Sequence, residues 1–249
     1  MRLLVAPLLL LTPSLVHADA LAQLREALAS LPATQSVSAT VELEFTTIGR
    51  ADDDDESEAK PETARLAVRA EAGGNDLRVL WPRAILDAAA AERGNRDPDA
   101  GQPLRAALAR VDVQDIDAYL NAAPTLLNLI DQATVQADAP DTRDGRSLRR
   151  LTLALDPPLS AQARKYVKDI DATASIWVDE GGMPVAAERA LKIGGRAMLV
   201  ISFENETRES WEFARRGDRL VVTRHDSDSN SSGGGESGSE RRRSSLRFE

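Results

Sequence analysis

The spacing of apolar residues changes early in the chain. Residues 19–31 carry leucines at intervals of three and four, which predicts an amphipathic helix that ends at Pro32. From Val37 every second residue is apolar, which predicts a one-sided strand over residues 37–48. A strand of this length usually curves around a core.

The next segments repeat the same two patterns. Alternation in residues 64–70 and 77–81, on either side of Gly73-Gly74, predicts two more strands of a meander. Helical spacing then dominates, with Asp112 and Asn121 as candidate caps. The predicted helices are 82–93, 103–110 and two short ones on either side of Pro124.

The second half returns to strands. Ser160 is a candidate cap for a short helix that ends near Val167, and Gly181-Gly182 and Gly194-Gly195 are typical of hairpin turns. Because several hairpin-linked strands follow one another, we predict an α+β fold with an antiparallel sheet. The predicted strands are 132–137, 148–155, 170–178, 185–193, 197–203, 211–213 and 220–222.

The ends of the chain differ from this pattern. Residues 1–18 combine Arg2 with a short apolar run and small residues, as in a secretory signal peptide cleaved after Ala18 or Ala20. The run is shorter than the roughly 20 residues that cross a bilayer, although an uncleaved anchor is the alternative. We expect an exported, periplasmic protein without a transmembrane segment in its mature form. Its single domain covers residues 19–226.

Two segments are predicted to be flexible. Residues 51–62 form an acidic loop between the first two strands, in which a solvated loop is favoured over a Ca²⁺ site because a turn glycine is missing. Residues 227–249 are rich in Ser and Gly and end in a basic cluster, Arg241 to Arg243, which predicts a flexible tail. A final edge strand is the alternative for the last residues. The basic cluster is a candidate site for acidic lipid headgroups or an acidic partner.

Composition narrows the possible functions. The formal charge is −9, with 31 basic and 40 acidic residues, which argues against nucleic-acid binding. More than half of the negative excess lies in residues 52–62, so it belongs mainly to one loop and is not spread over the whole surface. The absence of cysteine excludes disulfides, thiolate metal sites and an N-terminal lipid anchor.

The sequence carries no recognisable catalytic or cofactor motif. His225 stands beside Asp226 and Asp228, but neighbours in a strand point to opposite faces, so we do not expect a catalytic histidine there. Phosphate-binding glycine loops, serine-nucleophile elbows and metalloprotease helices are missing. We therefore expect neither an enzyme nor a bound metal or cofactor.

The organisation resembles the periplasmic lipoprotein carrier superfamily, the LolA/LolB-like fold. The shared features are a signal ending in Ala18-Asp19-Ala20, an opening helix with Leu24-Arg25 and Leu28, the long strand 37–48, a meander, inserted helices and further antiparallel strands. This resemblance implies a curved antiparallel sheet, an open half-barrel, with helices covering its concave face and a hydrophobic cavity between them.

These observations lead to a ligand hypothesis and an alternative. We expect the protein to bind a lipid or a lipoprotein acyl chain on the apolar face of the sheet, as a non-enzymatic binder. The alternative is an envelope interaction module with a packed core, no ligand and an envelope protein as partner. The expected ligand-binding residues are Val41, Leu43, Phe45, Leu66, Val68, Val79, Trp81, Leu127, Ile176, Leu199, Ile201 and Phe203.

Overall fold

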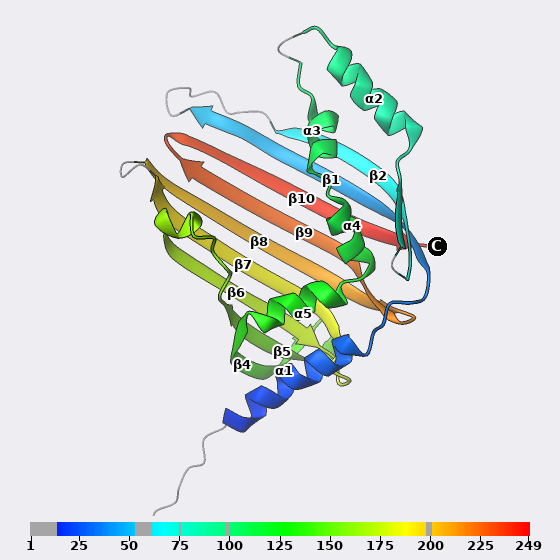
Figure 1. Ribbon diagram of the computed structural model, residues 1–249, viewed down its shortest axis with the longest axis vertical. Coiled ribbons are helices and arrows are strands. Elements are labelled where there is room, and N and C mark those ends of the chain that lie inside the picture. The colour runs from blue at the N-terminus through cyan, green and yellow to red at the C-terminus, as the bar shows by residue number, and fades with distance from the viewer. Residues whose placement is uncertain (1–13, 53–60, 75, 98–99, 198–200) are drawn as a thin grey trace, which may run out of the picture.

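The computed structural model describes residues 14–52, 61–74, 76–97, 100–197 and 201–249. In these residues ten strands form one antiparallel sheet, in the order β3-β2-β1-β10-β9-β8-β7-β6-β5-β4, accompanied by five α-helices (Figure 1). Strands β3 and β4 stand at the two edges of the described sheet, which is therefore open. The predicted α+β class with an antiparallel sheet is confirmed.

The first third of the chain follows its apolar spacing closely. The opening helix is α1 (Ser14–Ala29), and the meander consists of β1 (Val37–Asp52), β2 (Glu62–Gly73) and β3 (Asp76–Leu80). The predicted acidic loop lies mostly in residues 53–60, outside the described residues.

The helical block also follows its pattern. Its members are α2 (Arg83–Gly94), α3 (Pro103–Arg110), α4 (Val113–Leu120) and α5 (Ala123–Asp131). Asp112 caps α4 as predicted, because its carboxylate accepts a hydrogen bond of 2.8 Å from the backbone nitrogen of Gln114. Asn121 is also a cap, at the other end: it is the C-cap of α4, and its backbone nitrogen donates a hydrogen bond of 2.8 Å to the carbonyl of Asp117.

The remaining strands are longer than the alternation indicates. They are β4 (Ala133–Arg143), β5 (Arg146–Leu155), β6 (Val167–Val178), β7 (Pro184–Ala197), β8 (Ile201–Arg216), β9 (Arg219–Gly233) and β10 (Glu236–Phe248), with a 3₁₀ turn η1 (Ala163–Lys165) before β6. The predicted strands 197–203 and 211–213 are therefore parts of β7 and of the single strand β8. Gly194-Gly195 lies within β7 and is no hairpin turn.

The prediction of a flexible tail is wrong. Residues 227–233 continue β9, Gly234 and Gly235 form the turn with φ of 65° and 83°, and β10 follows. β10 is central and not an edge strand, since it pairs with β9 on one side and with β1 on the other. Backbone hydrogen bonds to two neighbours order this segment despite its Ser and Gly content.

The helices α1, α3, α4 and α5 lie on one face of the sheet, here called the helix-side face (Figure 1). The core fills the space beneath them, and its members come from both layers. Leucines of α1, Ile116 and Leu120 of α4 and Ile130 of α5 pack with Val41, Leu43, Leu66 and Leu153 of the sheet, and all are buried.

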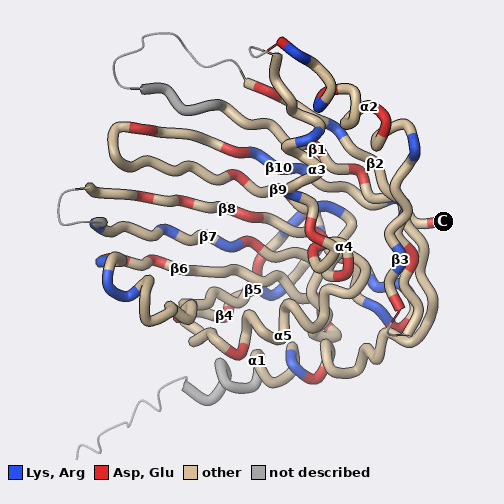
Figure 2. The backbone as a smooth tube through the Cα atoms, turned by 45° about the horizontal axis from the view of Figure 1, so that its top comes forward, with Lys and Arg blue, Asp and Glu red and all other residues tan. Residues whose placement is uncertain are grey.

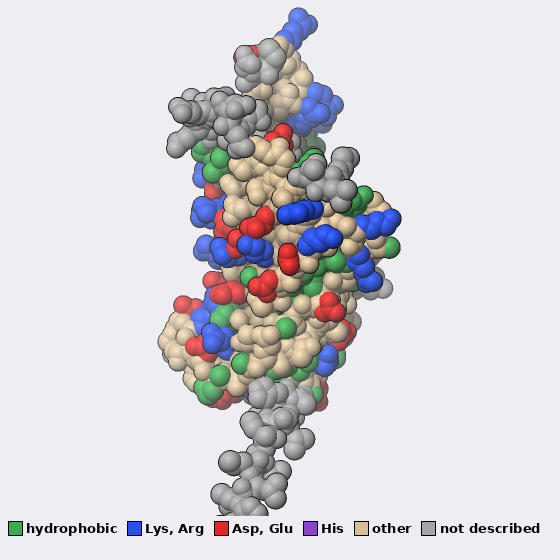
Figure 3. All heavy atoms as spheres, turned by 90° about the vertical axis from the view of Figure 1, so that its left-hand side faces the viewer, with side chains coloured by type: hydrophobic (Ala, Val, Ile, Leu, Met, Phe, Trp, Pro, Cys, Tyr) green, Lys and Arg blue, Asp and Glu red, His purple; other side chains and the backbone are tan. Residues whose placement is uncertain are grey.

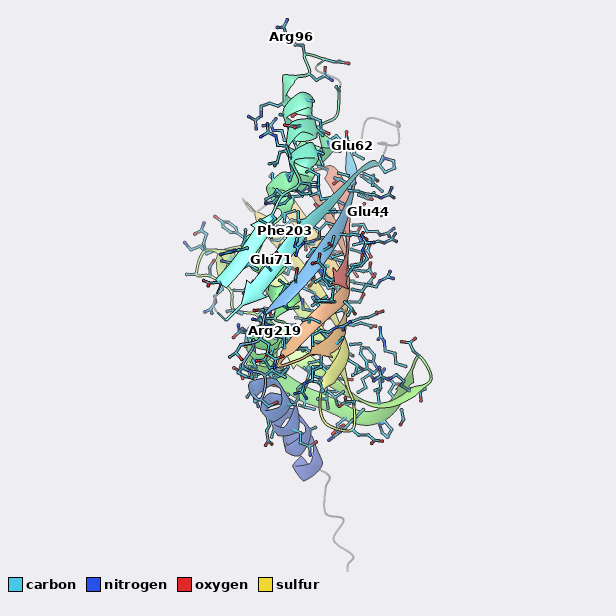
Figure 4. All side chains as sticks on the ribbon, turned by 90° about the vertical axis from the view of Figure 1, so that its right-hand side faces the viewer. Glu44, Glu62, Glu71, Arg96, Phe203 and Arg219 are labelled. Atoms are coloured by element: carbon cyan, nitrogen blue, oxygen red, sulfur yellow. The ribbon has the colours of Figure 1, made fainter. Side chains whose placement is uncertain are left out.

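The opposite face of the sheet carries charged side chains, among them Glu44, which Figure 4 labels, and Figure 2 marks the charged positions along the strands. Glu44 lies 2.6 Å from Arg65 of β2, and Arg243 of β10 lies 3.8 Å from both Glu44 and Asp226. Acidic and basic side chains thus alternate across four neighbouring strands. Cross-strand pairing of this kind keeps a wide exposed face soluble.

The turn between β8 and β9 anchors the segment that follows α1. Arg219 is buried, and its guanidinium donates hydrogen bonds of 2.8 and 2.5 Å to the carbonyls of Gln35 and Ala33. The carboxylate of Asp218 accepts from the backbone nitrogen of Thr34 at 2.7 Å. These contacts fix the position at which the chain leaves α1 and enters β1.

Candidate functional site

A polar row crosses the helix-side face in the middle of the sheet. Strand register places Arg242 (β10), Ser227 (β9), Glu209 (β8) and Arg189 (β7) opposite one another. The adjacent row contains Ser244, His225 and Trp211. In other parts of the sheet, the strand positions that point toward the helices carry apolar core residues. In these two rows the same positions carry polar residues, so polar groups face the helices here.

A cavity of about 380 Å³ lies between these rows and the helices α4 and α5. Its lining is mixed, with an apolar part from both layers and a polar part from the two rows. The lining residues are Asp115, Ala118, Tyr119, Ala122, Thr125, Leu126, Asn128, Leu129, Gln132, Arg189, Glu209, Trp211, Phe213, Val222, His225 and Arg242.

Tyr119 connects α4 to the sheet. Its hydroxyl lies 2.9 Å from Nδ1 of His225 and 3.0 Å from the hydroxyl of Ser244. Burial raises the pKa of Tyr119, and the charge of Arg242 and the Ser244 hydrogen bond lower it only in part. The phenol therefore stays protonated near neutral pH. Both of its hydrogen bonds are with the protein, so it acts as a structural link and not as a free nucleophile.

Glu209 is the acidic centre of the site. Arg189 donates to its carboxylate through Nε at 2.7 Å and also through Nη2. The Nε2 atom of His225 lies 3.5 Å from Oε1 of Glu209 and makes no hydrogen bond of good geometry. Burial alone would raise the pKa of Glu209, but the interactions with His225 and Arg189 outweigh burial and lower it.

Arg242 forms the second charged pair, beneath α4. Its Nη1 donates to Asp115 at 2.7 Å, and its guanidinium lies over the rings of Phe45 and Tyr119, 5.5 and 5.7 Å from their centroids. Its Nε and Nη2 atoms are buried without a hydrogen-bond partner. The aromatic rings offset part of the cost of burying this cation.

Most of the expected ligand-binding residues lie in the packed core and not along the cavity. Six of them are buried, and three more, Val79, Trp81 and Leu127, are half-buried and pack against that core. Their side chains pack closely against one another, and none of these nine residues lines the cavity of about 380 Å³. The buried six are Val41, Leu43, Phe45, Leu66, Val68 and Ile176.

Of the other three expected residues, Ile201 and Phe203 lie at the start of β8. Ile201 is 41% exposed, and the ring of Phe203 lies over Gly195. Leu199 lies outside the described residues. Ile201 and Phe203 are far along β8 from the polar rows, so the structure does not gather the eleven described members of the expected set into one site.

The histidine and the basic cluster occupy different places from those expected. His225 is 6% exposed and lies at the centre of the sheet instead of at the edge of a flexible linker. Arg241 and Arg243 form ion pairs on the charged face, with Asp228 and with Glu44 and Asp226. Arg242 points to the opposite face, as strand alternation requires.

Hollows also exist on the charged face. Two of them have volumes of about 280 and 660 Å³, and both include Asp226 in their lining. The larger one is lined by the ion-paired Arg243 and Glu44 and also by Leu43 and Leu66, two of the expected ligand-binding residues.

Comparison of the chain with protein-family models, with curated proteins and with solved structures finds no match. In the described part of the chain, no helix is long and apolar enough to cross a membrane. Among the same residues, no three histidine or acidic side chains come together as a metal site. The site must therefore be interpreted from its own geometry.

Proposed function

We propose that the protein is a non-enzymatic binder of an apolar ligand, such as a lipid or acyl chain, held between α4, α5 and the sheet. The supporting observation is the cavity of about 380 Å³, a volume within the range of small-molecule sites. In this proposal the sheet is the curved wall of an open half-barrel, the helices cover its concave face, and the resemblance to lipoprotein carriers reflects a shared fold.

The apolar part of the cavity supports a chain-like ligand. Leu126 and Leu129 of α5 face Trp211, Phe213 and Val222 of β8 and β9 across it. Trp211 and Phe213 are half-buried, so a ligand could cover their remaining exposed surface. Burial of apolar surface supplies about 25 cal/mol per Å², the main driving force for binding a hydrocarbon chain.

The charges of the site support a ligand of which only the apolar chain enters the cavity, with any charged end left outside. Arg189 is paired with Glu209, and Arg242 with Asp115, so the two cations are already matched by two anions. Tyr119 and His225 are hydrogen-bonded to each other. The polar wall is therefore internally paired and orients the helices, while the apolar wall holds the ligand.

The tight packing beneath α3 and α4 supports a second candidate. Val41, Leu43, Leu66 and Val68 are at most 3% exposed, as in a module that needs no ligand. In that case the protein would act as an envelope interaction module through its charged face. Binding measurements with an acyl probe separate the two candidates.

A cavity-filling variant tests the proposed function. Ala118 of α4 lines the cavity, and Ala106 of α3 is exposed. We expect a fluorescent fatty acid to bind the natural protein and to bind Ala118→Trp at least about tenfold more weakly, a loss of about 1.4 kcal/mol. Ala106→Trp, the control, should bind normally. Absence of fatty-acid binding by the natural protein would contradict the proposal and favour the packed module.

The proposed location is the periplasm, after removal of the signal segment. Intact-mass measurement of protein from the periplasmic fraction tests it. We expect a chain that begins after Ala18 or Ala20. A full-length chain in the membrane fraction would indicate the uncleaved anchor instead.

A further inference from the structure

We propose that the end of the sheet at which β6, β7 and β8 meet binds an anionic membrane surface. This β6–β8 tip consists of the described residues Arg164, Lys165, Tyr166, Lys168, Arg196 and Ile201. The proposal goes beyond ligand binding, because it uses neither the cavity nor the polar rows.

Two large apolar side chains are exposed at the tip although they are distant in sequence. Tyr166, after η1, is 39% exposed, and Ile201, at the start of β8, is 41% exposed. The carbonyl of Tyr166 accepts a hydrogen bond of 2.9 Å from the backbone nitrogen of Arg196. In the register of β7 and β8, Arg196 lies opposite Ser202, the residue after Ile201. The three strands thus hold both apolar side chains at the same end.

The base of the tip is tightly packed. The ring of Phe203 lies so close to Gly195 that a Cβ at that position would overlap it. A Cβ at Gly233 of β9 would lie 3.1 Å from Cβ of Phe203. Two glycines therefore allow the Phe203 side chain to pack against the sheet, which gives the exposed residues beyond it a rigid base.

Basic side chains surround the apolar ones. Arg164, Lys165, Lys168 and Arg196 are all exposed. Figure 3 looks onto this end of the molecule and shows Lys and Arg side chains together with acidic ones on it. At the β6–β8 tip these four basic residues stand against Asp169 of β6, while farther across the same end of the sheet Asp52 of β1 lies opposite Glu236 of β10. Lys192, farther along β7, is already paired with Glu204 at 3.0 Å.

This composition fits a membrane surface. Tyrosine rings favour the headgroup region of a bilayer, and an aliphatic side chain beside them can enter the acyl boundary. Each Lys or Arg near an anionic surface contributes about 1 kcal/mol of attraction. The chain as a whole has a charge of −9, so the attraction must come from the basic side chains of the β6–β8 tip itself.

Vesicle flotation with the full chain tests the proposal. We expect the protein to float with vesicles of phosphatidylcholine and phosphatidylglycerol, not with pure phosphatidylcholine, and to be released by salt. The double variant Arg164→Gln, Lys165→Gln should bind about 25-fold more weakly, about fivefold for each charge. Ile201→Ser should also weaken binding.

Matched controls keep the test specific. Arg83→Gln removes an exposed charge from α2, and Leu80→Ser removes an exposed leucine from β3 at the other edge of the sheet. Both should bind like the natural protein. The proposal would be overturned if the protein bound both vesicle types equally or bound neither. It would also be overturned if the double variant or Ile201→Ser bound as well as the natural protein. Fatty-acid binding measured without vesicles reports separately on the cavity.

Discussion

The imidazole of His225 lies parallel to the indole of Trp211, with centroids 5.0 Å apart and an angle of 3° between the planes. Tyr119 holds the same imidazole through Nδ1. The histidine is thus fixed by a ring on its own sheet and by a hydroxyl from α4. This arrangement makes His225 a junction between the two layers.

Replacement of His225 should destabilise the protein. His225→Leu removes one of the two hydrogen-bond partners of the Tyr119 hydroxyl and one of the groups that stabilise the Glu209 carboxylate, both in a buried place. We expect a loss of about 1–3 kcal/mol in the free energy of unfolding, measured by urea denaturation. Arg224→Gln, on the exposed face of the same strand, should change it by less than about 0.5 kcal/mol. An equal effect of both changes would contradict the assigned role.

Glu209 should make stability depend on acid pH. The interactions with His225 and Arg189 outweigh burial and lower its pKa in the folded state. A carboxylate with a lowered pKa stabilises the fold above its unfolded pKa of about 4.3, and this contribution is lost as the pH falls through the folded pKa. We expect Glu209→Gln to be less stable than the natural protein at pH 7.

The difference between those two proteins should shrink on acidification. Below the folded pKa the natural Glu209 is protonated and resembles glutamine. Urea denaturation at a series of pH values from neutral to acidic measures the difference. A difference that stays constant across this range would show that the carboxylate charge contributes nothing.

Arg219 should be sensitive to replacement although it is distant from the cavity. Arg219→Met leaves the carbonyls of Gln35 and Ala33 without their donor in a buried place. We expect a loss of about 2–4 kcal/mol, seen as a lower Tm in calorimetry. Arg215→Met, which removes one exposed hydrogen bond to Gly217 in the same hairpin, is the control and should leave Tm nearly unchanged.

Two adjacent glycines of β7 should respond differently to alanine. A Cβ at Gly195 would overlap the Tyr166 carbonyl and the Phe203 ring, whereas the nearest atom to a Cβ at Gly194 is 3.9 Å away. We expect Gly195→Ala to cost about 1–3 kcal/mol. Gly194→Ala should be neutral or slightly stabilising, because alanine reduces the freedom of the unfolded chain. Similar Tm values for the two variants would contradict the packing of Phe203.

Local patterns were sufficient for most elements. The helix 103–110 and the start of β1 at Val37 coincide with their predictions, since apolar period and proline position determine them locally. β10 could not be predicted in this way. Its Ser, Gly and Arg content is typical of a linker. Its order depends on pairing with β1, which is distant in sequence, and with the polar end of β9, which has no apolar alternation of its own.

The site was missed for a related reason. In β8 the positions that face the helices run Phe203, Asn205, Thr207, Glu209 and Trp211, so polar residues interrupt the apolar alternation. That interruption divided one strand into two in the prediction. A charged residue in phase with apolar neighbours, such as Glu209 before Trp211, is the signal that the sequence does offer. The contribution of Tyr119 requires knowledge of how α4 packs, which spacing alone does not provide.

The position of β10 between β1 and β9 also concerns synthesis. Val41 pairs with Leu246, so β1 to β3 join the rest of the sheet only through β10, which is synthesised after all the other described strands. Pairing between such distant segments carries a large loop-closure cost and slows folding. A nascent chain that lacks residues 236–248 therefore has two separate groups of strands, each with an open edge, and β10 joins them last.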